Sequence, residues 1–135
     1  MLQIAIIGLG SFGIRMLEEL NEIDCEVIIL DKDQNVIDKY KDFARSAFVT
    51  DAINKTALQK CIPQDIDVAI VDLGDNLEGA IMTTNYLHKM GIKKIVTKAH
   101  ENEHGEVLKL VGATNVVYPD LDAAQRLTPM LASKE

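Results

Sequence analysis

The sequence predicts an α/β fold, a doubly wound sheet of six parallel strands, from two observations. Short runs of Ile, Val, Leu and Ala alternate with longer stretches of helical periodicity along the chain. Four of these runs are almost continuously apolar, which is typical of strands covered by helices on both faces. Because single helices link successive strands, each strand–helix–strand unit should be a right-handed crossover between parallel strands.

The elements are expected in strict alternation. Helix ends are indicated by Gly91 and Gly112, which suit a C-terminal cap, and the Thr128-Pro129 step should kink or break the last helix. The expected strands are Gln3–Ile7, Glu26–Leu30, Ser46–Val49, Val68–Val71, Lys94–Thr97 and Asn115–Tyr118. The expected helices are Phe12–Ile23, Asn35–Phe43, Lys55–Cys61, Leu77–Met90, Asn102–Val111 and about Leu121–Leu131.

Length and composition favour one compact domain that stays in the cytoplasm. The 135 residues contain no linker-like stretch, no apolar run of membrane-spanning length and no signal peptide at the N-terminus. The net charge of −7, with lysines interleaved among more numerous carboxylates, argues against a nucleic-acid partner. Cys25 and Cys61 have no metal-ligand spacing, so we expect two small, partly buried thiols.

A glycine turn follows the first strand and opens the first helix: Gly8-Leu9-Gly10-Ser11-Phe12-Gly13. In this context G-x-G-x-x-G is the fingerprint of a Rossmann-like dinucleotide site. Gly8 should allow the tight turn, Gly10 the approach of a pyrophosphate, and Gly13 the close packing of helix on sheet. The start of the helix would offer free N–H groups and a positive dipole end to the phosphates.

An acid stands where the ribose of such a ligand would lie. Asp31 ends the second strand, eighteen residues after Gly13, and is placed to accept hydrogen bonds from the adenosine ribose. It would repel a 2′-phosphate by up to roughly 4 kcal/mol, so NAD(H), ATP, ADP or AMP should bind better than NADP(H). Of its neighbours Lys32 and Asp33, the latter is expected to cap the second helix. Asp51-Ala52 either lies beside the adenine or is a simple capping turn.

With these residues in place, the chain resembles the N-terminal RCK domain, the regulator-of-potassium-conductance module of Ktr/Trk transporters (TrkA-N type), over nearly its whole length. The segments that carry the resemblance are Ile6–Gly13, Leu30–Asp33, Thr50–Ala52, Val68–Asn76, Val96–Ala99 and Gly112–Pro119.

The resemblance implies a cytoplasmic, non-enzymatic gating subunit that binds NAD(H) or ATP/ADP/AMP. Its partner would be an integral-membrane potassium transporter subunit, which would hold it at the inner face of the cell membrane. Members of the family dimerise and often build octameric rings, through a final helix that crosses between subunits. Residues 1–119 would then be the Rossmann domain and 120–135 the crossover, or dimerisation, helix.

The resemblance also assigns site residues. Beyond the glycine turn, Asp31 and Asp51-Ala52, it places Lys98 and the turn after the fourth strand near the distal phosphates or nicotinamide. The complete predicted set is Gly8, Gly10, Ser11, Phe12, Gly13, Asp31, Lys32, Asp51, Ala52, Gly74, Asp75, Asn76 and Lys98.

The chain departs from the family pattern in two respects. Many ATP-sensing members carry Arg where this chain has Ser11, with Arg15 one turn later as a partial substitute. The C-terminal lobe of the family is also missing, so the chain is either truncated or a single-domain subunit.

The sequence also contains features of two other functions, a zinc site and an oxidoreductase. His100-Glu101-Asn102-Glu103-His104 matches the zinc motif H-E-x-x-H, but no third ligand completes it, so no metal site is predicted. The enzyme alternative is the nucleotide-binding fragment of an NAD-dependent oxidoreductase. Hydride transfer needs a positioned substrate and an acid or base, usually from a second domain, so no catalytic residue is assigned.

Overall fold

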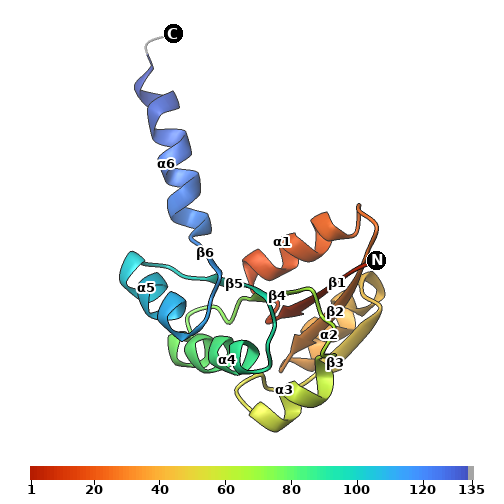
Figure 1. Ribbon diagram of the computed structural model, residues 1–135. Coiled ribbons are helices and arrows are strands. Elements are labelled where there is room, and N and C mark those ends of the chain that lie inside the picture. Colours follow the sequence, from red (N-terminus) through yellow and green to blue (C-terminus); the bar gives the residue numbers. More distant parts are fainter. Residues whose placement is uncertain (134–135) are drawn as a thin grey trace.

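The computed structural model describes residues 1–133, which form a three-layer α/β domain with one projecting helix (Figure 1). The six strands are all parallel and lie in the order β3-β2-β1-β4-β5-β6. Their bounds are β1 Leu2–Ile7, β2 Cys25–Asp31, β3 Ser46–Val49, β4 Val68–Val71, β5 Lys94–Lys98 and β6 Asn115–Val117. The predicted doubly wound, Rossmann-like sheet is therefore confirmed.

Helices cover both faces of the sheet, as the apolar strands require. On one face Ile4 and Ile6 of β1 pack with Leu17 and Leu20 of α1. On the other face, the alternate residues of the same strand join a second core with α3 and α4. The bounds are α1 Ser11–Leu20, α2 Gln34–Tyr40, a 3-10 turn η1 Lys41–Phe43, α3 Lys55–Cys61, α4 Leu77–Lys89, α5 Asn102–Val111 and α6 Pro119–Ala132.

Helix ends account for most differences from the predicted elements. The first helix ends at Leu20 and not at Ile23, because the chain turns through residues 21–24 into β2. The second is interrupted after Tyr40, where a 3-10 turn replaces the predicted last turn of α-helix. Gly91 and Gly112 follow α4 and α5 with φ of 84° and 130°, which confirms their part in ending these helices.

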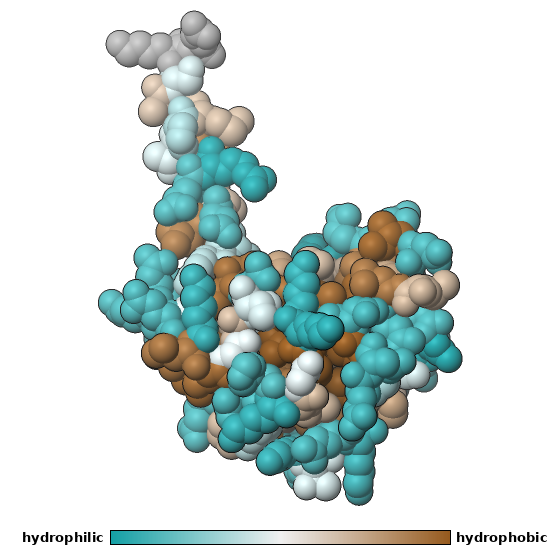
Figure 2. All heavy atoms as spheres, viewed as in Figure 1, coloured by the Kyte–Doolittle hydropathy of each residue, from teal (hydrophilic) through white to brown (hydrophobic). Residues whose placement is uncertain are grey.

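The last helix, α6, stands clear of the domain in Figures 1 and 2. It begins at Pro119, whose fixed φ suits the first helical position. Pro129 does not break it: only three helical residues follow, so the missing N–H removes one hydrogen bond close to the end. No residue of α6 is buried. Lys134 and Glu135, the last two residues of the predicted segment 120–135, lie outside the described residues.

None of the helices between residues 1 and 133 combines the length and the apolar character needed to cross a bilayer.

Candidate nucleotide-binding site

A cleft opens at the carboxyl ends of the strands, beside the point where the strand order reverses between β1 and β4. Open α/β sheets bind their ligands at such points. The cleft contains about 520 Å³ of empty space, including its open mouth, which is within the range of small-molecule sites. Its lining residues are Gly8, Leu30, Asp31, Lys32, Thr50, Asp51, Ala52, Ile53, Asp72, Leu73 and Asn76.

The glycine turn is held between β1 and the start of α1 by close backbone contacts. Gly8 has φ of 89°, and its N–H donates to the carbonyl of Leu30 at 2.8 Å. A side chain at Gly8 would collide with the backbone carbonyl of Asp72, and one at Gly13 with that of Gly8. The conformation that brings the chain from strand to helix therefore needs glycine at both positions.

Free backbone donors gather at the start of α1. Within residues 1–133, no hydrogen bond is made by the N–H groups of Gly10, Ser11 and Phe12, and no side chain of the N-cap residue covers them. A helix start with open N–H groups and a positive dipole end attracts an anion. We call these three N–H groups the α1 donors; they form the part of the site that is suited to a phosphate.

Asp31 lies beside the glycine turn and is held in place by two backbone N–H groups. Its Oδ2 accepts the N–H of Leu9 at 2.8 Å, and its Oδ1 accepts that of Asp33 at 2.9 Å. Each carboxylate oxygen keeps one further acceptor position, which ribose hydroxyls can use. Asp33 caps α2 by accepting the N–H of Asn35, as predicted.

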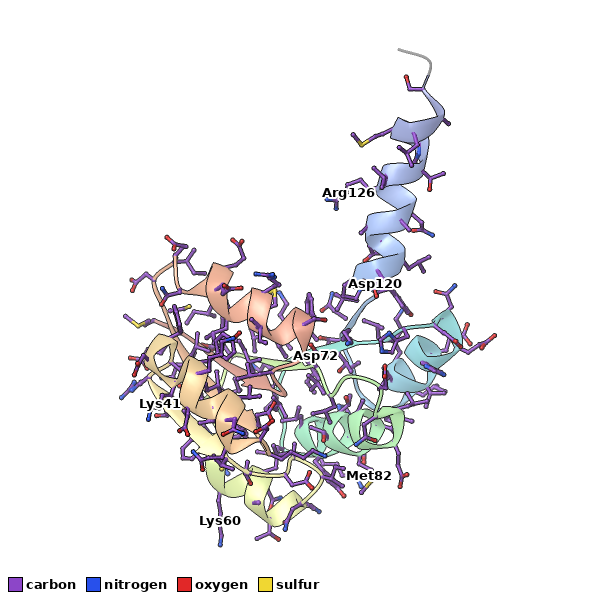
Figure 3. The ribbon with its side chains drawn as sticks, turned by 180° about the vertical axis from the view of Figure 1, so that it is seen from behind. Lys41, Lys60, Asp72, Met82, Asp120 and Arg126 are labelled. Atoms are coloured by element: carbon purple, nitrogen blue, oxygen red, sulfur yellow. The ribbon has the colours of Figure 1, made fainter. Side chains whose placement is uncertain are left out.

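Asp72 is a site residue that the sequence reasoning did not single out. Its carboxylate is completely buried beneath the glycine turn, at the centre of the molecule in Figure 3. Its Oδ2 accepts the N–H of Gly13 at 2.9 Å, and its Oδ1 accepts that of Gly74 at 3.2 Å. The Nζ of Lys98 lies 3.0 Å from the same Oδ1. The only available signal was a polar residue directly after the apolar run of β4.

The predicted site residues do not all meet in the cleft. Those brought together there are Gly8, Asp31, Lys32, Asp51, Ala52 and Asn76. Gly10, Ser11, Phe12 and Gly13 form the adjoining start of α1, and Phe12 packs into the core. Gly74 and Asp75 are exposed; the carboxylate of Asp75 points to solvent and contacts His100 Nε2 at 2.9 Å.

The structure gives Lys98, Arg15 and Asp51 other partners than the sequence suggested. Lys98 is only 8% exposed and faces Asp72, so its ammonium group is already paired. Arg15 is 80% exposed and bonds Glu18 on the outside of α1. Asp51 does not cap a helix: it accepts the N–H of Ile53 in a turn, while Asn54 caps α3.

The two histidines of the H-E-x-x-H match do not share a ligand position. His100 contacts Asp75, whereas His104 lies 3.7 Å from Glu101. No group of three or more His, Cys, Asp or Glu side chains within residues 1–133 is arranged to hold a metal ion. Cys25 and Cys61 are partly buried and free, as expected.

Comparison with known proteins finds relatives that are named as potassium uptake proteins. It is 32% identical over 131 residues to Ktr system potassium uptake protein C of Bacillus subtilis, which covers 97% of this chain and 59% of that protein. The chain thus spans about 60% of the length of the Ktr proteins it matches.

Solved structures with the same fold include ligand complexes. The Kef CTD of Shewanella denitrificans in AMP-bound form superposes with a TM-score of 0.80, at 22% identity, over 98% of this chain and 82% of that one. The GsuK channel bound to NAD superposes with a TM-score of 0.73, at 15% identity, over 86% of this chain and 21% of that one.

The family model of the TrkA-N domain matches residues 4–119, which takes in every strand but the first two residues of β1 and reaches the start of α6. The chain belongs to the TrkA-N domain family.

Proposed function

We propose that this chain is the nucleotide-sensing part of a regulatory subunit of a potassium channel or transporter of the Ktr/Trk type. The observation that carries the proposal is a cleft that contains the carboxylate of Asp31 and adjoins the α1 donors. The similarity to a Ktr potassium uptake protein supports the assignment to potassium transport.

The ligand proposed for this site is NAD(H) or an adenine nucleotide, ATP, ADP or AMP. Its phosphate would rest against the α1 donors, because backbone N–H groups at a helix start stabilise an anion. Its ribose hydroxyls would donate to Asp31. The adenine would lie towards Asp51 and Ala52, which line the far side of the cleft. Related folds with AMP and NAD bound support this choice.

The subunit would act by binding its ligand better in one conformation than in another. A ligand can shift such an equilibrium only through that difference in affinity. A membrane transporter subunit would read the shift at the inner face of the membrane. A second copy of the chain, joined through α6, would complete the regulatory unit. No catalytic step is proposed.

Calorimetric titration of the purified chain with NAD⁺, NADH, ATP, ADP, AMP and NADPH tests the proposal. At least one of the first five should bind with a one-to-one stoichiometry, and NADPH should bind more weakly than NADH. Replacement of Gly10 by Val should abolish binding, because its side chain would collide with the buried carboxylate of Asp72 and displace the turn that carries the α1 donors. If none of the nucleotides binds, or if the Gly10→Val variant is folded and binds equally well, the proposal is wrong.

A further inference from the structure

The buried pair of Asp72 and Lys98 lies under the proposed phosphate position and is not needed to bind a phosphate. Both side chains are almost inaccessible, at 0% and 8% exposure. Lys98 lines a hollow with Ser11 at the start of α1, yet its ammonium group contacts the carboxylate of Asp72. The charges of the pair largely cancel for a ligand placed above it.

Asp72 also occupies part of the anion-binding end of α1. It accepts the N–H of Gly13, a fourth donor of the first turn beside the α1 donors. A Cβ built on Gly10 would lie 2.5 Å from its Oδ2. A carboxylate that is paired with Lys98 therefore already occupies the space directly beneath the turn that would cradle a phosphate.

The rest of the cleft supplies little positive charge to offset it. Among the described residues that line the cleft, the carboxylates of Asp31, Asp51 and Asp72 stand against one ammonium group, that of Lys32. Arg15 is bonded to Glu18 and lines a separate hollow on the outside of α1. Within residues 1–133, the two cations near the α1 donors are both engaged, Lys98 by Asp72 and Arg15 by Glu18. A terminal phosphate, with two negative charges of its own, would therefore find neither of them free.

We infer that Asp72 sets the charge preference of this site by holding Lys98 and one N–H of α1 away from the ligand. The site then selects dinucleotides joined by an internal diphosphate, such as NAD⁺ and NADH, over nucleotides that end in a polyphosphate, such as ATP. Each phosphate of a dinucleotide carries one negative charge and needs no separate cation. This inference rests on the proposed nucleotide-binding function.

The test compares the affinities of NADH and ATP, measured by calorimetry at one fixed salt concentration, in four proteins. Wild type should bind NADH more tightly than ATP. The Asp72→Asn variant frees the Lys98 ammonium group and removes one carboxylate, so its affinity for ATP should rise about tenfold and that for NADH by about threefold or less. The double variant Asp72→Asn/Lys98→Gln, which keeps the net charge, should lose most of the gain for ATP.

Asp65→Asn is the matched charge control. Asp65 is exposed at the opposite end of the sheet, in a hollow with Gln3 and Glu26. Removal of its charge should leave the ratio of the two affinities unchanged. Thermal unfolding of each variant establishes that it is folded. Where Asp72→Asn fails to fold, Asp72→Ser, which keeps a smaller hydroxyl acceptor beneath the turn, takes its place with the same expected gain for ATP.

The outcomes separate this inference from the proposed function. If wild type binds neither nucleotide, the function itself is wrong. If wild type binds a nucleotide but prefers ATP to NADH, the function stands and the inference is overturned. An unchanged ratio in folded Asp72→Asn, or a gain for ATP that persists in the double variant, also overturns it, because Lys98 would then have no part in the preference.

Discussion

The three carboxylates that line the cleft differ in their hydrogen-bond partners, and these partners decide which of them can bind a ligand. Both oxygens of Asp31 accept backbone N–H groups, so its position is set before any ligand arrives. Asp51 is exposed and bonds only the N–H of Ile53. Asp72 is buried and bonded to Gly13, Gly74 and Lys98. Asp31 is therefore the preorganised partner for a sugar.

Replacement of Asp31 by Asn should narrow the preference for NADH over NADPH. The carboxylate that repels a 2′-phosphate is lost, so the ratio of the two dissociation constants should fall about tenfold in calorimetric titrations. Asp33→Asn is the control, because Asn also caps helices well and the α2 cap is retained. A ratio equal to that of wild type in Asp31→Asn would remove Asp31 from the account of specificity.

Replacement of Gly10 by Ala should destabilise the fold as well as weaken binding. The new Cβ would lie 2.5 Å from a carboxylate that is buried and has three partners, so either group must move. We expect a loss of roughly 1–3 kcal/mol in the free energy of unfolding, measured by urea denaturation. Ser11→Ala, at the exposed neighbouring position, should change stability by less than about 0.5 kcal/mol. Equal stability of the two variants would contradict the close approach at Gly10.

The cysteines should react slowly with alkylating reagents at neutral pH. Burial raises the pKa of the Cys61 thiol, and burial followed by the nearby charge of Asp24 raises the pKa of Cys25. A raised pKa lowers the fraction of reactive thiolate at pH 7, and the fraction grows as the pH increases. Alkylation followed by mass spectrometry should be slower for both than for N-acetylcysteine at pH 7, with the difference shrinking above pH 9. Faster alkylation than the free thiol would contradict this picture.

At the scale of elements, α6 differs from the other helices because it adds nothing to the core. It buries no residue, and its side chains Leu127, Met130 and Leu131 are 50–74% exposed. A helix with this much exposed apolar surface is unusual in a monomer unless another surface covers it. This is the observation that makes α6 the candidate contact between copies of the chain in the proposed regulatory unit.

Removal of residues 121–135 should leave the domain folded. Since no residue of α6 is buried in the described chain, the free energy of unfolding should change by less than about 1 kcal/mol at protein concentrations where the full chain is monomeric. The mass measured by light scattering should fall to that of a monomer if α6 joins two copies. A truncated chain that unfolds, or one that keeps the oligomeric state of the full chain, would contradict the assignment. Pro129→Ala, which retains all contacts but restores an N–H, is the control.

At the scale of the whole molecule, ligand binding and folding are linked. The cleft is built from the ends of β1, β2, β3 and β4 and the loops that follow them, so the site exists only when the sheet is assembled. A ligand that binds only the folded chain stabilises it by an amount set by the ratio of its concentration to its dissociation constant.

NADH at one hundred times its dissociation constant should therefore stabilise the chain by about 2.7 kcal/mol. For a domain of this size this corresponds to an increase in Tm of roughly 10 °C, measured by differential scanning calorimetry. The Gly10→Val variant should show no increase under the same conditions. An increase of equal size in that variant would mean that NADH binds somewhere other than the glycine turn.

The sequence alone determined the fold class, the order of the elements and the glycine turn, because each is encoded within a short stretch of chain. Apolar periodicity identifies strands and helices over a few residues, and G-x-G-x-x-G lies wholly between β1 and α1. Ends of helices were less predictable, since the turn at residues 21–24 and the 3-10 turn after Tyr40 depend on where the next strand must begin.

Only the tertiary structure decided which charges meet. Asp72 and Lys98 are 26 residues apart, and they meet because β4 and β5 are neighbours in the sheet and end at the same edge. Arg15 lies only one helical turn after the glycine turn in sequence. In the structure its side chain is on the outer face of α1, where it bonds Glu18 and does not face the phosphate position. Side-chain partners follow from strand order, register and helix rotation, which are properties of the assembled sheet and not of any local stretch of residues.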